Sequence, residues 1–136
     1  MIYHCIRFTI KPEVPQETVD AIIDGMGAQN ADSPGAVFGR DFGGEYQYAA
    51  VSSVADLEEY EKMMNDPAHL QVDRMGLPLI ERFASFDVTD DKDPEMGEKI
   101  AAIHQRRFDA HPDLVELISN LKEYIGSAAP GRHATS

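Results

Sequence analysis

The strongest constraint on the fold of this 136-residue chain is the order in which strand-like and helix-like hydrophobic patterns follow one another in its first 90 residues. Runs with strand-like alternation and runs with helical spacing follow one another as strand, helix, strand, strand, helix, strand. The strands are expected at 2–10, 36–42, 45–53 and 81–88, and the helices at 16–29, 53–65 and 67–76. Gly43-Gly44 is a typical hairpin turn, which makes the second and third strands antiparallel neighbours. This order predicts a ferredoxin-like α+β fold.

The first strand has no clean polar face. Its even positions carry one histidine, His4, among apolar residues, and its odd positions are mixed. The even residues are Ile2, His4, Ile6, Phe8 and Ile10, and the odd residues are Tyr3, Cys5, Arg7 and Thr9. A strand of this kind is expected to be covered on both sides of its sheet. Cys5, the sole cysteine, is expected to be a small buried hydrophobe.

The helical stretch between the third and fourth strands is interrupted at Asp66-Pro67. Ser53 is the expected cap of its first part, and Asp66 is the expected cap of its second part, with Pro67 in the first turn. His69 then lies near the start of a helix, where the positive end of the helix dipole disfavours imidazolium. A neutral ring is the form that accepts a proton.

The chain is divided into an α+β domain, residues 1–90, and a C-terminal helical extension, residues 91–136. Two amphipathic helices are expected in the extension, at 93–110 and 112–125, with Gly126 as the stop and a frayed, disordered tail from 127. The second helix aligns five large apolar residues, so it is expected to pack on its own sheet or on a partner chain. His104 and His111 are expected to face solvent, and the Arg106-Arg107 pair to be a helix C-terminal charge effect.

Composition excludes several classes of function. The formal net charge is −12 and no Lys/Arg cluster is present, which argues against nucleic acid and against anionic membrane surfaces as partners. No apolar run is long enough for a membrane span, and the N-terminus has no signal-peptide pattern, so a cytoplasmic location is expected. No glycine-rich phosphate loop follows a strand, and no organic cofactor is implied.

Four short motifs resemble those of the stress-responsive A/B-barrel family, the dimeric α+β barrels also called Dabb domains. They are the strand-borne His4, Gly39-Arg40-Asp41, Pro67-Ala68-His69 and the closing Phe86-Asp87. The resemblance covers about residues 1–90 and leaves the extension out. It implies a homodimer in which two four-stranded sheets pack face to face, with helices outside. One face of the first strand then meets helices and the other meets the partner.

The resemblance also implies where chemistry would occur. His4 and His69 match two acid/base or orienting histidines of a plant polyketide cyclase of this family, so they are the candidate catalytic residues. Two tyrosines of that enzyme's pocket are not matched: one position falls near Met26, the other on Met63, with Tyr60 one turn earlier. The cyclase substrate therefore does not transfer. The expected substrate-binding residues are Ile6, Phe8, Met26, Tyr60, Met63, Phe83 and Asp87.

Two functions stay open at this point. The first is a small-molecule enzyme that performs acid/base chemistry next to a carbonyl, as a cyclase, isomerase or lyase acting on a polyketide-like or aromatic-pathway metabolite. The second is a non-catalytic, ligand-binding or stress-responsive homodimeric barrel whose pocket is closed by bulky side chains such as Phe8, Met26, Met63 and Phe83. No metal site is expected, because His-x-x-x-His and cysteine clusters are absent. The chain also has no tryptophan, which argues against a relation to haem-degrading barrels.

Overall fold

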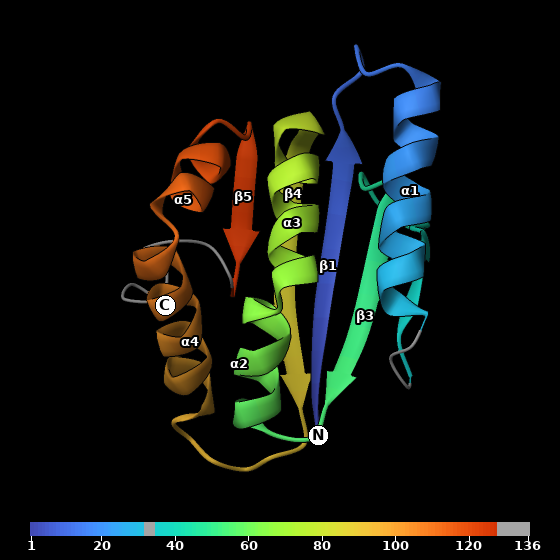
Figure 1. Cartoon of the computed structure of the whole chain (residues 1–136). Coiled ribbons are helices and arrows are strands. Elements are labelled where there is room, and N and C mark those ends of the chain that lie inside the picture. Colours follow the sequence, from blue (N-terminus) through green and yellow to red (C-terminus); the bar gives the residue numbers. More distant parts are fainter. Residues whose placement is uncertain (32–34, 128–136) are drawn as a thin grey trace.

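The central strand of the molecule is β1 (Ile2–Ile10), whose bounds are those that its alternation predicts. In the computed structural model, which describes residues 1–31 and 35–127, β1 lies in a five-stranded sheet of order β2-β3-β1-β4-β5. It pairs antiparallel with both neighbours, as does β2 with β3, whereas β5 runs parallel to β4. The first four strands have the ferredoxin-like arrangement that the sequence predicts (Figure 1).

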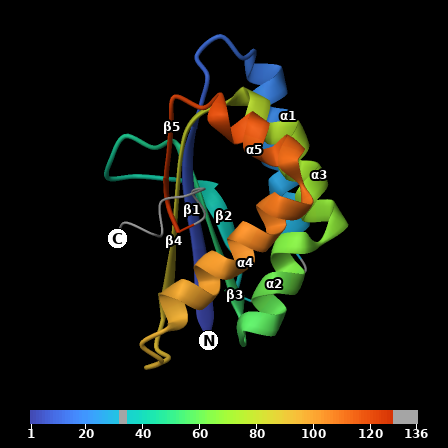
Figure 2. The same ribbon diagram turned by 90° about the vertical axis from the view of Figure 1, so that its left-hand side faces the viewer.

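All the helices of the described residues lie on one face of the sheet, and none of them covers the other face, which is called the uncovered face below (Figure 2). The remaining elements are α1 (Gln16–Asn30), β2 (Val37–Arg40), β3 (Tyr48–Val54), α2 (Leu57–Asn65), α3 (Pro67–Gly76), the 3-10 turn η1 (Leu77–Leu79), β4 (Ile80–Thr89), α4 (Met96–Ala110), α5 (Pro112–Ser119) and β5 (Glu123–Gly126). The expected frayed tail, apart from Ser127, lies outside the described residues.

The cap of α2 is Asp56, and the prediction of Ser53 was wrong. Ser53 is drawn into β3, where it pairs with Tyr3 of β1, so the chain turns into the helix three residues later than expected. The Asp56 carboxylate accepts a hydrogen bond from the backbone N–H of Glu59. Asp66 caps α3 as predicted, because its side chain accepts from the backbone N–H of Ala68.

The second helix of the extension ends at Ser119, and the prediction of a helix to residue 125 was wrong. The chain leaves the helix and adds β5 to the free edge of β4, through hydrogen bonds that include Lys122 N–H to Glu81 O (2.9 Å) and Ser127 N–H to Ser85 O (3.0 Å). Tyr124 stacks on Phe83 with ring centroids 5.0 Å apart. An exposed strand edge carries unpaired backbone groups, and pairing them outweighs two further turns of helix here.

The extension packs against its own sheet and contributes to both hydrophobic clusters of the interior. Phe108, Leu114 and Ile118 join Phe8 and Ile10 in one cluster. Met96, Ile100 and Ile103 join Ile2 and Tyr60 in the other. Removing the extension would therefore expose apolar side chains of the first 90 residues as well as its own.

The uncovered face of the sheet is apolar at several exposed positions. Tyr3, Val37, Phe86 and Val88 are each at least 41% exposed, although Cys5 beside them is buried, as predicted. Register places Tyr3 opposite Val88, and Cys5 between Val51 and Phe86. A contiguous apolar patch of this kind marks an interaction surface in many soluble domains.

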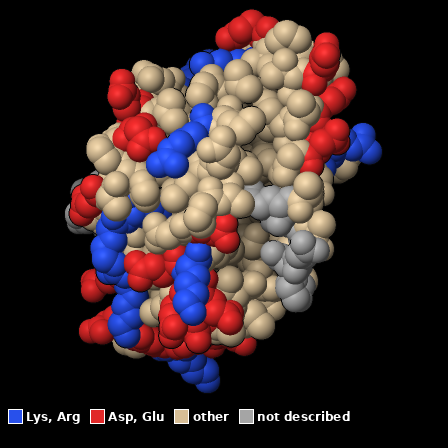
Figure 3. Space-filling model, viewed as in Figure 1, with Lys and Arg blue, Asp and Glu red and all other residues tan. Residues whose placement is uncertain are grey.

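Charged side chains are unevenly placed on the helical face. Acidic groups line the edge formed by α1, whereas cationic and acidic groups alternate over α2 and α4 (Figure 3). Examples over α2 and α4 are the Arg106–Glu61 and Lys62–Glu58 pairs. No helix within the described residues is long and apolar enough to cross a membrane.

Candidate functional site

A cavity of about 780 Å³ lies between the sheet and the helices. Its mouth reaches the surface beside α1 and α3, because the exposed residues Gly25, Ala28, Ala68 and Gln71 line it. Its interior is walled by β1, β3, β4 and the helices, and by residues of the extension. The volume lies within the ~300–1,000 Å³ range of small-molecule sites.

Six of the nine predicted site residues line this cavity. They are His4, Ile6, Met26, Met63, His69 and Phe83. The other three lie outside its lining. Phe8 is fully buried in the hydrophobic core, while Tyr60 and Asp87 stand behind His4 and contact its ring. The bulky residues that were considered as a plug therefore do not fill the space.

His4 is held from behind by a buried carboxylate. Asp87 pairs with His4 across the β1–β4 ladder, and its Oδ1 lies 2.8 Å from Nδ1 of the ring. Because an ionised carboxylate only accepts hydrogen bonds, Nδ1–H of His4 is the donor. The opposite nitrogen, Nε2, is then the ring atom available to a ligand.

Tyr60 joins this pair to the extension. Its hydroxyl, 3.1 Å from Nδ1 of His4, donates to Asp87 Oδ1 at 2.9 Å and lies 2.8 Å from Nε2 of His104. Since the single hydroxyl proton goes to Asp87, Nε2–H of His104 donates to the Tyr60 oxygen. His104 is 0% exposed, so the expectation that it faces solvent was wrong.

This network favours an ionised Asp87 and a neutral Tyr60. Burial alone would raise the pKa of the Asp87 carboxyl, but the hydrogen bond and charge of His4, with the Tyr60 hydroxyl, outweigh it and lower that pKa. Burial and the adjacent Asp87 charge raise the pKa of Tyr60. Tyr60 is therefore a fixed hydrogen-bonding group at physiological pH.

His69 lies in the first turn of α3, where the sequence predicts it. Its Nδ1 is 3.1 Å from the carbonyl oxygen of Met63, in the last turn of α2. A carbonyl oxygen only accepts, so Nδ1–H is the donor and Nε2 is the unprotonated nitrogen of the neutral ring. Nε2 lies 3.5 Å from Oδ2 of Asp73, one turn further along α3.

The His69 ring is held in its neutral form. Burial is the main factor that lowers its pKa, the positive charge of Arg107 and the His4 ring lower it further, and the Asp73 carboxylate opposes them. The side chain keeps 20% of its surface exposed, so a ligand in the cavity can reach it. A neutral imidazole that lines the cavity and has an unprotonated Nε2 is suited to accept a proton.

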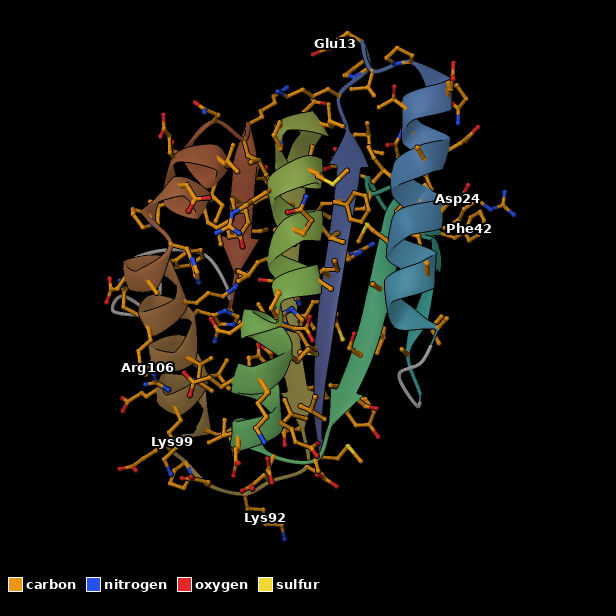
Figure 4. The ribbon with its side chains drawn as sticks, in the orientation of Figure 1. Glu13, Asp24, Phe42, Lys92, Lys99 and Arg106 are labelled. Atoms are coloured by element: carbon orange, nitrogen blue, oxygen red, sulfur yellow. The ribbon has the colours of Figure 1, made fainter. Side chains whose placement is uncertain are left out.

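Arg107 lies in the last turn of α4, where a helix C-terminal charge effect was expected, but its side chain is buried and has further partners. It is 3% exposed, its Nε–H donates to the carbonyl oxygen of Met64 at 2.7 Å, and its Nη2 contacts Asp73 Oδ2. Arg106 instead points outward from α4 and pairs with Glu61 (Figure 4). The two adjacent arginines therefore have different surroundings.

The extension supplies cavity residues that the sequence reading did not select. Arg107, Ile118 and Tyr124 come from α4, α5 and β5 in turn. Burial raises the pKa of the Tyr124 hydroxyl, which is therefore neutral. A signal for the α4 residues was present, because the stripe Met96, Ile100, Ile103 continues at helical spacing to His104 and Arg107. Among the described residues there is no group of three or more His, Cys, Asp and Glu side chains arranged to hold a metal.

Together, the fold and the cavity define a ferredoxin-like α+β domain with a histidine-lined pocket under its helices. The chain belongs to the stress-responsive A/B barrel domain family, whose model matches residues 2–90. The match ends at the boundary of the extension. No curated protein matches the chain.

Solved structures with the same fold include proteins of known and unknown function. A dimeric ferredoxin-like protein of unknown function from Thermobifida fusca is 20% identical, with a TM-score of 0.58 over 65% of this chain and 89% of its own. A Dabb family protein from Mesorhizobium loti is 19% identical, with a TM-score of 0.58 over 66% and 96%. A hydroxynitrile lyase from Passiflora edulis is 17% identical, with a TM-score of 0.58 over 67% and 94%. At these identities the likeness establishes the fold alone.

Proposed function

We propose that this protein is a small-molecule enzyme that moves protons next to a carbonyl group, as a cyclase, isomerase or lyase. The observation that carries the proposal is that His4 and His69 line one cavity, each with Nδ1 occupied by a protein acceptor. Both rings therefore present Nε2 for exchange with a ligand. Paired groups of this kind are the usual requirement of acid/base catalysis.

In this reaction His69 is the base. Its Nε2 removes the proton from a carbon adjacent to the substrate carbonyl, and the electron pair of the broken C–H bond moves to the carbonyl oxygen as an enolate. The imidazolium formed lies 3.5 Å from Asp73, whose carboxylate stabilises it. A neutral ring is able to accept the proton, and the Asp73 carboxylate stabilises the imidazolium that forms, against the burial and the Arg107 charge that disfavour it.

His4 is the partner acid in the same reaction. When protonated, its ring donates a proton to the enolate oxygen, while Asp87 at 2.8 Å stabilises the imidazolium through Nδ1–H. Because β1 is the central strand and Asp87 holds the ring from the adjacent strand, His4 has little freedom to move. This rigidity favours orientation of a carbonyl group.

The proposed substrate is a largely apolar carbonyl compound, such as a polyketide-like or aromatic-pathway metabolite. Ile6, Met26 and Ile118 supply aliphatic wall, and the stacked rings of Phe83 and Tyr124 supply aromatic wall. The charges of Arg107 and Asp73 are paired with each other, so no Lys or Arg among the described lining residues is left unpaired for a strongly anionic substrate. That a hydroxynitrile lyase has the same fold supports a lyase as one variant of this proposal.

We also propose that the protein acts as a homodimer. The apolar patch of Tyr3, Val37, Phe86 and Val88 lies on the sheet face that no helix covers. The Thermobifida fusca protein of this fold is described as dimeric. The pairing of two such faces would bury these side chains and leave each helix-covered cavity facing outward.

Hydrogen–deuterium exchange at carbon tests the enzyme without knowledge of the product. A panel of aryl ketones, 1,3-dicarbonyl compounds and aromatic cyanohydrins is incubated with the protein in D₂O, and loss of the acidic C–H, or cleavage, is followed by ¹H NMR. We expect at least one compound to exchange or cleave, with a loss of about 10²–10⁴-fold in His69→Ala. His111→Ala, which alters a histidine outside the cavity lining, is the matched control and should keep the rate.

Binding without exchange would favour the second function, a ligand-binding or stress-responsive barrel. Support for this alternative comes from the predominantly apolar lining of the cavity, since such a site retains a ligand without reacting with it. Equal exchange rates in wild type, His4→Ala and His69→Ala would refute histidine-based chemistry. Thermal shifts of the same panel on the same variants separate loss of binding from loss of reaction.

A further inference from the structure

The last turn of α2 is the point where the two parts of the chain meet the proposed base. Carbonyl groups at a helix C-terminus have no partners within the helix. Here two successive carbonyls, those of Met63 and Met64, accept from His69 Nδ1–H and Arg107 Nε–H respectively. The same helix end therefore fixes the ring of His69 and the guanidinium of Arg107.

Asp73 closes this arrangement from the other side. Its Oδ2 contacts Nη2 of Arg107 and also lies 3.5 Å from Nε2 of His69. One carboxylate oxygen is thus shared between a permanent cation and the nitrogen that would accept a proton. The guanidinium approaches this oxygen more closely than the imidazole does, so Arg107 is its principal partner.

Arg107 is a charged side chain in a buried position, which is unusual. The side chain lies on the inner stripe of α4, where an apolar residue would complete the packing beside Ile103. Burial of a guanidinium costs several kcal/mol unless it is paired and hydrogen-bonded. All three groups, His69, Asp73 and Arg107, line the cavity.

We propose that Arg107, supplied by the extension, is a positioning residue for His69: it holds the Asp73 carboxylate and so keeps Nε2 of His69 unprotonated. The inference rests on the proposed role of His69 as the base. Without the cation, Asp73 would act on His69 alone and stabilise the imidazolium before substrate arrives. With it, the ring stays neutral until it takes the substrate's proton.

The charged and titratable groups around His69 all bear on this equilibrium. His4 faces it from β1 and Arg107 from α4, and both disfavour imidazolium, whereas Asp73 on its own helix favours it. Asp66, at the start of α3, lines the same cavity. Loss of the Arg107 charge removes a group that disfavours imidazolium and frees the Asp73 carboxylate, which favours it. Both effects raise the pKa of His69.

The test is an NMR titration of the His69 ring, assigned by comparison with His69→Gln, in the intact protein. We expect Arg107→Gln to raise the pKa of His69 by about one unit. Arg107→Lys, which keeps the charge but not the planar fork, should leave it near the wild-type value. Arg106→Gln, the exposed neighbour paired with Glu61, is the matched control and should not change it.

An equal rise in Arg107→Lys and Arg107→Gln would overturn the inference, because it would mean that the cavity had opened to water. Should Arg107→Gln not fold, Asp73→Asn gives an independent answer, and we expect it to lower the pKa of His69 further. A value unchanged in Asp73→Asn would also overturn it. The titration needs no substrate, so failure of this inference can be distinguished from failure of the proposed enzyme activity. If a substrate exchanges, the acid limb of its pH profile should move upward by the same amount in Arg107→Gln.

Discussion

Removal of one hydroxyl group should test the network behind His4. Tyr60 is 0% exposed, and its hydroxyl touches three polar groups: Asp87, His4 and His104. Tyr60→Phe keeps the ring that packs with Ile2 and Met64 while it deletes those contacts. The substitution therefore isolates the polar part of the interaction.

The expected loss of stability follows from the two closest contacts. A hydrogen bond to an ionised carboxylate contributes about 1.5–3 kcal/mol, and a buried polar group that loses a partner costs about 1–3 kcal/mol. We expect the free energy of unfolding to fall by about 3 kcal/mol, at the lower end of the sum, because Asp87 keeps His4 and neighbouring side chains relax. For a domain of typical stability this is a large fraction of the total.

Urea denaturation followed by far-UV circular dichroism measures this change. With a slope of about 1.5 kcal/mol per molar urea, the midpoint should fall by about 2 M. Met75→Leu, at an exposed position on α3 outside the proposed dimer interface, is the control and should shift the free energy of unfolding by less than about 0.5 kcal/mol. A change in Tyr60→Phe no larger than in the control would refute the network as a source of stability.

Three further outcomes follow from the geometry. Because the pKa of Asp87 is lower in the folded protein than its ordinary value, its charge stabilises the fold above about pH 4, and this stabilisation is lost as pH falls through the folded value. Asp87→Asn should therefore be less stable than wild type at pH 7 and approach it at pH 3, as urea titrations at both pH values would measure; a constant difference would contradict this. Phe86→Glu places a charge in the uncovered apolar patch and should give a monomer by light scattering, while Met75→Glu, exposed on α3, should stay dimeric; two dimers would count against that interface. Gly126→Ala puts a Cβ against the backbone of Ser85 at a positive φ of 107°, so β5 should detach, the free energy of unfolding should fall by about 2 kcal/mol, and the Ser127 amide should exchange faster. Gly97→Ala, with open space around it, is the control and should be neutral. Protection of the Ser127 amide in both variants would refute the close approach.

The fold of the first 90 residues could be predicted because local patterns and tertiary packing agree there. The alternation in β1 has the strand's bounds, and the Asp66-Pro67 cap begins α3 where expected. The disagreements occur where a long-range partner competes with local preference. Ser53 suits a helix cap, but its pairing with Tyr3 across the sheet takes it into β3. Residues 123–126 continue a helical pattern, but the free edge of β4 takes them into a strand.

Only part of the candidate site could be predicted from the sequence, because local patterns identify some of its residues and long-range packing brings in the others. His4 and His69 belong to short motifs that can be read locally, and both line the cavity. Asp73, His104 and Arg107 belong to no motif, because their meaning depends on which helix packs beside them. The apolar stripe of α4 continues at helical spacing to His104 and Arg107, but the prediction that His104 faces solvent did not make use of that spacing. A histidine and an arginine at such positions are more informative than the same residues on an exposed face, because burial of either requires a polar partner.

The position of these two residues bears on what the extension does. His104 and Arg107 are three residues apart, on one face of α4, and each meets a different half of the site. Through Tyr60, His104 supports the group that holds His4; through Asp73, Arg107 acts on His69. A helix whose purpose was only to cover apolar surface would gain more from leucine at both positions, because neither polar side chain would then need a partner. The family pattern alone therefore describes this site incompletely, since residues beyond position 90 complete both of its polar networks.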